Sequence, residues 1–318
     1  MKIGFIGNYQ SGYVGEQADE VHLTRELEKL GHEVFRIPRD EWREYVIEDS
    51  PKDKYKNVPE DIKLDILIIC KWHQFYDGSF IFKAREKYQC PVWYFVWDFM
   101  PNPDIPDWHK EMVKSADLYL SGELGIFGRY REIGGRPYYF QMDVCDGDIP
   151  TFNDLEKIHD VVFTGSCIDQ GHRKEWLPII NKEIPVKIFA WNPDEWTAMG
   201  FDASPAVYGE EYNKVIAQSK IVLGLSVEPN CWGYWSNRVG KVLRAGGFLL
   251  QEYAPGMEQL VEGRVDFFSS LEEAITKIRE IREIGEIGET EKWTSKNKVR
   301  QLALLMERYL KGGDKWLL

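Results

Sequence analysis

Two cationic side chains, Arg238 and Lys241, stand three residues apart where the sequence predicts the start of a helix. Residues at this spacing lie on one face of a helix. Apolar runs at 221–225 and 248–250 flank the helix and are typical of buried parallel strands. Two cations beside the free backbone N–H groups of a helix start would bind a diphosphate. An ordinary amphipathic helix with a solvated basic edge is the alternative that the spacing leaves open.

A second candidate anion site follows an apolar run at residues 160–164. Gly165 and Ser166 come directly after this predicted strand, and Arg173 lies further along the same loop. A Gly-Ser turn lets a phosphate approach the backbone, and an arginine would neutralise it. An ordinary strand-to-helix turn with a solvated arginine is the alternative.

Three side chains are candidates for acid–base chemistry. His73 and Asp98 follow the predicted strands at 64–70 and 91–97, so either side chain could take the proton of an acceptor hydroxyl. The alternatives are a hydrogen-bonded rim residue for His73 and a helix cap for Asp98. Glu16, after a glycine-containing loop, is the third candidate.

Two sheets are needed to position these residues. Apolar runs predict a first series of strands at residues 2–6, 33–37, 64–70, 91–97, 116–120 and 137–141. They predict a second series at residues 160–164, 186–190, 221–225, 248–250 and 265–268. Helices are expected at 16–30, 125–133, 210–218, 271–284 and 297–310. Polar residues 40–64 read as a surface excursion, and 191–206 as a loop near a nucleotide base. The polar stretch 141–156 is the candidate hinge, which gives domains at 1–150 and 151–295 and a final helix within 296–318.

Composition narrows the class of protein. The 318 residues are 43% hydrophobic, enough for two cores. No apolar run approaches the ~20 residues that span a bilayer, so a cytoplasmic protein is expected. The five cysteines are scattered and form no CxxC pair, which favours neither disulfides nor zinc. The formal net charge of −12 disfavours a nucleic-acid acceptor or an anionic membrane surface.

Two common motifs are excluded by position. Gly4, Gly7, Gly12 and Gly15 lack the G-x-G-x-x-G spacing of dinucleotide-binding enzymes, so an NAD enzyme is disfavoured. The D-x-D letters at 146–148 would suggest a metal, but they lie in the predicted hinge and are discounted. No metal site is therefore predicted.

The central stretch resembles a known family. The letters SNR at 236–238, GGFLL at 246–250, EY at 252–253, PG at 255–256, Glu258 and Leu260 resemble the C-terminal half of the glycosyltransferases related to the spore-maturation protein CgeB. The family has a glutamate three residues after the arginine, where this chain has Lys241. The letters GHEV at 31–34 resemble the start of the second strand in group 1 glycosyltransferases, and the Gly-Ser turn at 165–166 resembles the donor domain of the CgeB-like proteins.

This resemblance implies an α/β fold of two Rossmann-like domains facing a cleft, the GT-B architecture, with a C-terminal helix packing back on the first domain. It implies metal-independent transfer of a sugar from a nucleotide-sugar co-substrate, such as a UDP-, GDP- or ADP-sugar, to a hydroxyl acceptor. The first domain would take the acceptor and the second the donor. The expected donor-binding residues are Gly165, Ser166, Arg173, Arg238, Lys241, Tyr253 and Glu258. Lys241 in place of the family glutamate favours one alternative, a catalytically degenerate binding protein; a nucleotide-sugar epimerase is another.

Overall fold

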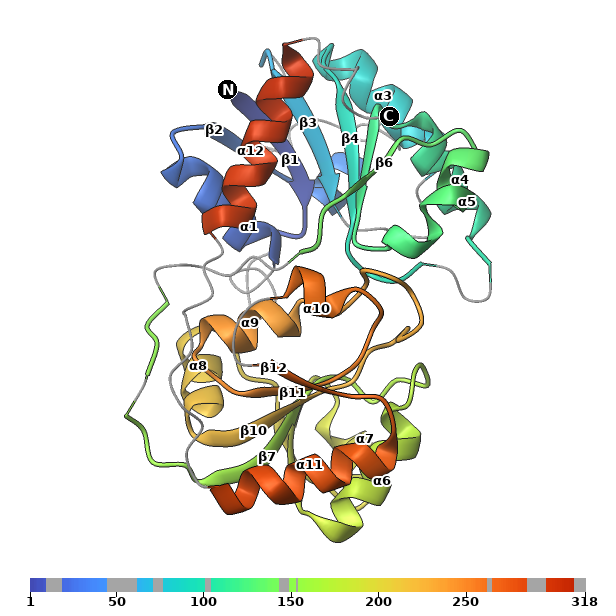
Figure 1. Cartoon of the computed structure of the whole chain (residues 1–318). Helices are drawn as coiled ribbons and strands as arrows, with labels where there is room; N and C mark the ends of the chain where they lie inside the picture. The colour runs from blue at the N-terminus through green and yellow to red at the C-terminus, as the bar shows by residue number, and fades with distance from the viewer. Residues whose placement is uncertain are drawn as a thin grey trace. The chain divides into compact units, whose positions relative to one another are not determined.

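The computed structural model describes residues 1–9, 19–44, 62–70, 77–100, 104–142, 149–152, 154–261, 265–284 and 296–311. The chain divides into two compact units. Unit 1 comprises Met1–Asp146 and Lys296–Leu318, and unit 2 comprises Gly147–Ser295 (Figure 1). Each unit has a six-stranded sheet, so the predicted α/β class is confirmed.

All strand pairs of unit 1 are parallel, in the order β2-β1-β3-β4-β5-β6. The strands are β1 (Lys2–Gly7), β2 (Glu33–Pro38), β3 (Ile66–Cys70), β4 (Val92–Val96), β5 (Leu118–Ser121) and β6 (Pro137–Tyr139). Most of their residues are buried, as the continuous apolar runs predict for strands covered on both faces. β3 and β4 are neighbours, which was the basis for placing His73 and Asp98 together.

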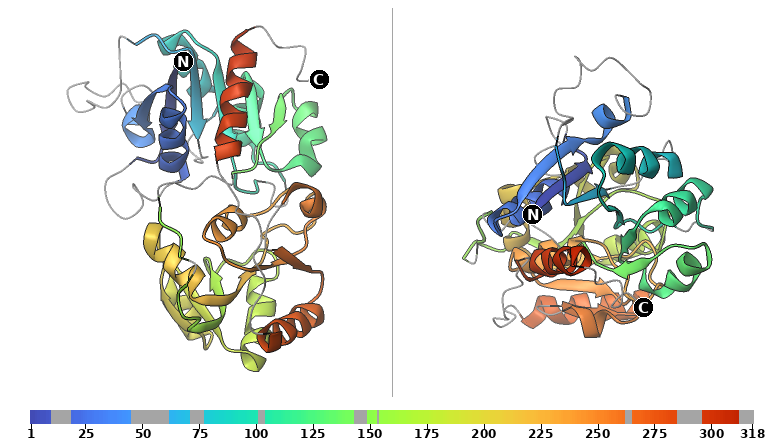
Figure 2. Two further views of the ribbon diagram at one scale, coloured as in Figure 1. Left: turned by 60° about the vertical axis from the view of Figure 1, so that its left-hand side comes forward. Right: turned by 90° about the horizontal axis from the view of Figure 1, so that it is seen from above.

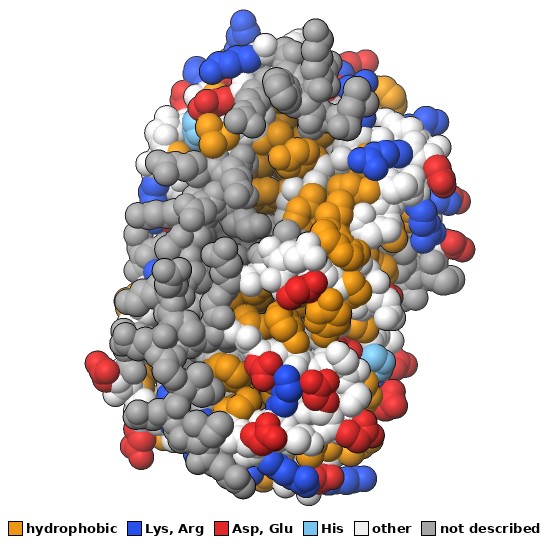
Figure 3. Space-filling model, in the orientation of Figure 1, with side chains coloured by type: hydrophobic (Ala, Val, Ile, Leu, Met, Phe, Trp, Pro, Cys, Tyr) orange, Lys and Arg blue, Asp and Glu red, His pale blue; other side chains and the backbone are white. Residues whose placement is uncertain are grey.

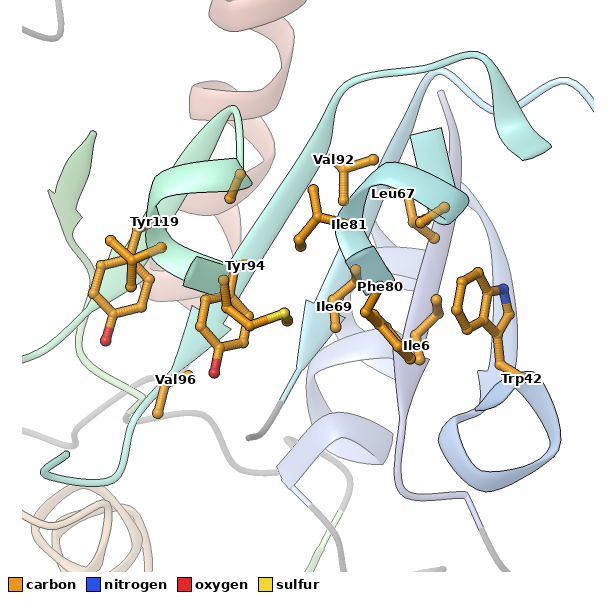
Figure 4. Close-up of a cluster of buried hydrophobic side chains, with 14 of the residues drawn as sticks. Ile6, Trp42, Leu67, Ile69, Phe80, Ile81, Val92, Tyr94, Val96 and Tyr119 are labelled. Carbon is orange, nitrogen blue, oxygen red and sulfur yellow. The ribbon is translucent and has the colours of Figure 1, made fainter. Parts of the chain in front are cut away.

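Helices cover both faces of this sheet. They are α1 (Asp19–Lys29), α2 (Arg39–Trp42), α3 (Gly78–Tyr88), α4 (Asp107–Ser115) and α5 (Phe127–Glu132). Successive strand residues point to opposite faces, and Figure 4 shows one face, on which side chains from β1, β3, β4 and β5 meet those of α2 and α3.

The segment 40–64 was predicted to be a surface excursion, but its first residues belong to α2 and reach the core. Trp42 is fully buried, its ring 4.4 Å from that of Phe80, because one large side chain suffices to anchor a polar segment.

The C-terminal helix α12 (Lys296–Leu310) packs on unit 1. It lies beside α1 (Figures 1 and 2). Leu302, Ala303 and Met306 are buried in the core on that face of the sheet, and the ring of Tyr309 meets that of Trp93 edge-on at 5.2 Å. The predicted return of the last helix to the first domain is confirmed.

Unit 2 has a parallel sheet in the order β12-β11-β10-β7-β8-β9. The strands are β7 (His159–Thr164), β8 (Val186–Ala190), β9 (Asp202–Pro205), β10 (Ser219–Gly224), β11 (Leu249–Glu252) and β12 (Val265–Phe268). The helices are α6 (Arg173–Glu183), α7 (Pro193–Ala198), α8 (Gly209–Ala217), α9 (Arg238–Arg244), α10 (Met257–Leu260) and α11 (Leu271–Ile284).

The stretch 191–206 is not the predicted loop. It contains α7 and the edge strand β9, which pairs with β8. Pro193 stands in the first turn of α7, and the fully buried Trp196 fixes the helix to the core. β9 carries no apolar run because it is an edge strand with exposed ends, so periodicity missed it.

Among the described cysteines, Cys70, Cys90 and Cys231 are buried and Cys167 is half-buried. In the part of the chain that the structure describes, no helix combines the length and the apolar composition needed to cross a bilayer.

Candidate functional site

Arg238 is the first residue of α9 and projects into the carboxyl edge of the unit 2 sheet. Its side chain is buried, and Nε donates a 2.7 Å hydrogen bond to the carbonyl oxygen of Thr164 at the end of β7. Its guanidinium carbon lies 4.8 Å from the centroid of the Phe163 ring. Nη1 is buried and has no hydrogen-bond partner among the described residues. A buried donor of this kind is costly unless something accepts from it.

Arg173 opens α6 and brings a second cation to the same ring. Its Nε and Nη2 donate to the carbonyl oxygen of Leu225, at 3.3 and 3.2 Å. The Arg173 guanidinium carbon is 5.7 Å from the centroid of Phe163. Burial, and then the charge of Arg238, lower the pKa of Arg173 to about 9, and burial lowers the pKa of Arg238. Arginine keeps its proton in proteins, so both side chains are cationic at neutral pH. Two buried like charges beside one ring are stabilised when an anion neutralises them.

Gly165 makes room for this arrangement. A Cβ atom there would lie 2.7 Å from Nη2 of Arg238 and 3.0 Å from the Phe163 ring, so a side chain would displace the guanidinium. The predicted role of a glycine at this turn was close approach of a phosphate. The structure shows that the arginine itself needs the space.

Replacing Gly165 by alanine is expected to weaken the binding of pyrophosphate about fivefold, or about 1 kcal/mol, because the guanidinium must move away from its place on Phe163. Isothermal titration calorimetry on the full chain measures the change. Gly128→Ala is the control, since a Cβ there meets nothing within 4 Å. Equal affinity for wild type and Gly165→Ala would show that this approach is not needed for anion binding.

Glu252 and His172 adjoin Arg173 and Arg238, called the cation pair below, and the sequence analysis gave these two residues no role. Glu252 ends β11 and is 2% exposed, and its Oε2 accepts a 3.0 Å hydrogen bond from the backbone N–H of Ser226. Its Oε1 lies 2.5 Å from Nδ1 of His172, whose ring stacks on that of Trp176 at 4.0 Å. Burial raises the pKa of Glu252, and the hydrogen bond with His172 opposes that shift. A charged residue closing an apolar strand was the signal that could have identified Glu252.

The loop between β7 and α6 is held against the loop after β10. Gly171 has φ +61°, and a Cβ atom there would lie 2.2 Å from the carbonyl oxygen of Ser226. Only glycine adopts this conformation at such close contact without strain. The contact fixes the chain immediately before His172 and Arg173, and so positions both side chains.

The other predicted donor-binding residues are Ser166, Lys241, Tyr253 and Glu258. Ser166 follows Gly165 and is half-buried, and Lys241 is half-buried one turn after Arg238 in α9. The hydroxyl of Tyr253 is hydrogen-bonded to the carboxylate of Glu258, which is exposed in α10. Of the predicted donor-binding residues, Gly165 lies against Arg238, and Arg173 and Arg238 both lie against the Phe163 ring.

In unit 1, Asp98 is exposed two residues beyond the end of β4. His73, Glu16 and the D-x-D letters at 146–148 lie outside the described residues. Among the described residues, no group of three His, Cys, Asp or Glu side chains is arranged to hold a metal ion.

Two parallel-sheet α/β units, with the C-terminal helix returning to the first, define the GT-B class, and solved structures share this fold. AviGT4, a glycosyltransferase involved in avilamycin A biosynthesis, is similar over 98% of both chains, with 13% identity and a TM-score of 0.61. Sucrose-phosphate synthase from Thermosynechococcus elongatus has 10% identity over 98% of this chain and 99% of its own, with a TM-score of 0.61. T4 phage BGT in complex with its UDP-glucose substrate has 13% identity over 100% and 97%, with a TM-score of 0.57. At these identities the likeness shows the fold alone.

The family model described as Glycosyl transferase-like matches residues 172–303. The matched segment contains Arg173, Arg238 and Glu252, so the cation pair and its neighbouring carboxylate lie within it. No curated protein matches the sequence. The narrower resemblance to the CgeB-related group stays a prediction.

Proposed function

We propose that the protein is a glycosyltransferase that moves a sugar from a nucleotide-sugar donor to a hydroxyl acceptor without a metal ion. The observation that carries this proposal is the pair of buried guanidinium groups on Phe163, with Nη1 of Arg238 lacking a partner among the described residues. A diphosphate supplies the negative charge and the acceptor oxygens that this pair lacks. The GT-B fold and the Glycosyl transferase-like match over 172–303 support the same reading.

In the proposed reaction, the bond between the anomeric carbon and the diphosphate oxygen breaks, and the acceptor oxygen bonds to that carbon. The leaving diphosphate is stabilised by Arg238 and Arg173, with Lys241 as a further cation, which removes the need for a metal. Asp98 takes the proton of the acceptor hydroxyl. Unit 2 is proposed to hold the donor, a UDP-, GDP- or ADP-sugar, and unit 1 the acceptor.

A small hydroxyl acceptor is favoured over a nucleic acid. The formal net charge of −12 would repel a polyanion. On the face drawn in Figure 3, the described acidic and basic side chains are interspersed and form no continuous basic area. One structure with this fold is the DNA-modifying enzyme β-glucosyltransferase. The net charge of the present chain argues against DNA as its own acceptor.

A thermal-shift screen of UDP, GDP, ADP, TDP and CMP, and of their common sugars, with and without EDTA, tests the donor site. A ligand that binds only the folded state raises stability by RT ln(1 + [L]/Kd). A shift with one nucleoside diphosphate that survives EDTA is expected. The absence of any shift would contradict the proposed donor site.

Product analysis separates the remaining readings. Release of the nucleoside diphosphate together with glycosylation of an added hydroxyl acceptor is expected of the transferase. Conversion of the nucleotide sugar without any acceptor would indicate an epimerase. Binding of the nucleotide without turnover on any acceptor would favour a catalytically degenerate protein, which Lys241 in place of the family glutamate also favours.

A further inference from the structure

A buried carboxylate holds the chain just beyond the end of β4. Glu123, two residues after β5, is 1% exposed, and its Oε1 accepts a 2.6 Å hydrogen bond from the backbone N–H of Met100. Met100 is two residues after Asp98. The hydrogen bond therefore fixes the backbone that carries the proposed catalytic base.

The other carboxylate oxygen is held equally firmly. Oε2 of Glu123 accepts from Ser121 Oγ at 3.1 Å and from the Tyr119 hydroxyl at 3.3 Å, and it also accepts from the Tyr130 hydroxyl. The backbone N–H of Glu123 donates to Ser121 Oγ at 3.0 Å. Donors from β5 and α5 thus keep the side chain in one position.

A neutral histidine extends this network to β4 and α4. His109 is fully buried, with Nδ1 hydrogen-bonded to the Tyr94 hydroxyl at 3.1 Å and Nε2 to the Tyr119 hydroxyl at 3.2 Å. Figure 4 shows the rings of Tyr94 and Tyr119 side by side on neighbouring strands, with their hydroxyl groups pointing the same way. A buried network in which every member is satisfied fixes one arrangement of the elements that it joins.

An apolar side chain would fill the position of Glu123 at lower cost, because burying a carboxyl group is unfavourable. An apolar residue could accept none of the hydrogen bonds donated to Glu123, and the one from the Met100 N–H is the one that reaches the chain beyond β4. We propose that Glu123 is a positioning residue, which holds residues 97–100 so that Asp98 meets the acceptor hydroxyl. This inference rests on the proposed function.

The ionisation of Glu123 supplies a readout. Burial raises the pKa of Glu123 to about 7, against hydrogen bonds donated by Tyr130, Met100, Ser121 and Tyr119. The groups that face the network are the hydroxyls of Tyr94, Tyr119 and Tyr130 and the imidazole of His109, whose pKa burial lowers to about 3. The charged carboxylate accepts more strongly from the Met100 N–H than the neutral acid does, so kcat is expected to rise with pH through about 7.

The stability of the fold depends on the ionisation of Glu123 in the opposite sense to kcat. Because the folded-state pKa of Glu123 lies above the ordinary 4.5, this group stabilises the fold most below pH 4.5, and the contribution is lost as the pH rises through about 7. For His109, whose folded-state pKa lies below 6.5, the contribution is present above pH 6.5 and is lost as the pH falls toward 3. As the pH rises through about 7, the ionisation of Glu123 is therefore expected to raise kcat and to lower the stability of the fold.

The test is Glu123→Gln in the full chain. We expect kcat to fall ~10-fold because the acceptor for the Met100 N–H is weakened and the loop is misplaced, while the donor KM stays within about twofold. The ionisation near pH 7 should disappear from the kcat profile. Hydrogen exchange of a peptide spanning 97–100 should become faster. If Glu123→Gln does not fold, Glu123→Asp, which keeps the charge but shortens the reach, is expected to give the same kcat loss.

Asp117→Asn is the matched control. Asp117 Oδ2 accepts a 2.7 Å hydrogen bond from the backbone N–H of Val92, at the opposite end of β4 from Asp98. This variant should keep both kcat and the ionisation near pH 7. A kcat loss as large in Asp117→Asn as in Glu123→Gln would overturn the inference, because general loosening of β4 would then explain both.

Two further outcomes separate the inference from the proposed function. An unchanged kcat profile in Glu123→Gln, together with an inactive Asp98→Asn, overturns the positioning role alone. Full activity of Asp98→Asn removes Asp98 from the chemistry and overturns the proposed base and the inference together.

Discussion

Replacing Arg238 by alanine is expected to weaken the binding of the donor's nucleoside diphosphate by ~10-fold or more. The substitution removes a buried cation whose Nη1 has no partner among the described residues, and a charged hydrogen bond contributes ~1.5–3 kcal/mol. It also relieves the like-charge repulsion with Arg173, so the pKa of Arg173 should rise. Isothermal titration calorimetry on the full chain, with the nucleotide that the thermal-shift screen identifies, measures the loss.

Arg279→Ala is the control for Arg238→Ala. Arg279 is an exposed arginine of α11 paired with Glu183, so its removal takes away a charge from unit 2 without touching Phe163 or β7. Its affinity should match that of the wild type, since exposed ion pairs contribute little. If the two variants bind the nucleotide equally well, Arg238 does not contact the diphosphate.

Replacing Asp98 by asparagine is expected to lower kcat by about 10²–10⁴-fold, the usual contribution of a general base, because an amide cannot take the acceptor proton. Donor affinity should stay the same, because the substitution leaves the cation pair of unit 2 intact. Asp98 is exposed, so the isosteric change should also leave the melting temperature nearly unchanged.

Asp104→Asn is the matched control for this prediction. Asp104 is an exposed carboxylate a few residues beyond Asp98 that pairs with Arg129, and it should be dispensable for turnover. Normal kcat in Asp98→Asn would transfer the role of base to His73 or Glu16, the other candidates from the sequence. Single substitutions at those positions would then decide between them.

The fold was predictable where strands are buried on both faces. Residues 66–70 and 92–96 are unbroken apolar runs because helices cover both sides of the unit 1 sheet, and such runs are visible without any neighbour. The edge strand β9 has polar, exposed ends, so its identity depends on pairing with β8 and leaves no local pattern. The burial of Trp42 also depends on contacts with residues that are distant in the sequence, so the sequence pattern did not predict it.

The candidate site was predictable only in part, for a related reason. Gly165 directly follows β7 and Arg238 opens α9, so the order of elements along the chain was enough to select them. The pairing of His172 with Glu252 joins residues 80 positions apart, and Glu123 gathers partners from β5, α5 and the chain after β4. No spacing rule connects such residues, because the three-dimensional packing decides which polar groups are buried together.

The return of α12 to unit 1 bears on how the protein is made. Leu302, Ala303 and Met306 complete the core on the face of the sheet that carries Trp93, yet they are translated after all of unit 2. Unit 2 is one continuous segment and has all its residues before α12 emerges. During synthesis the first unit therefore keeps this apolar face uncovered until α12 has been made.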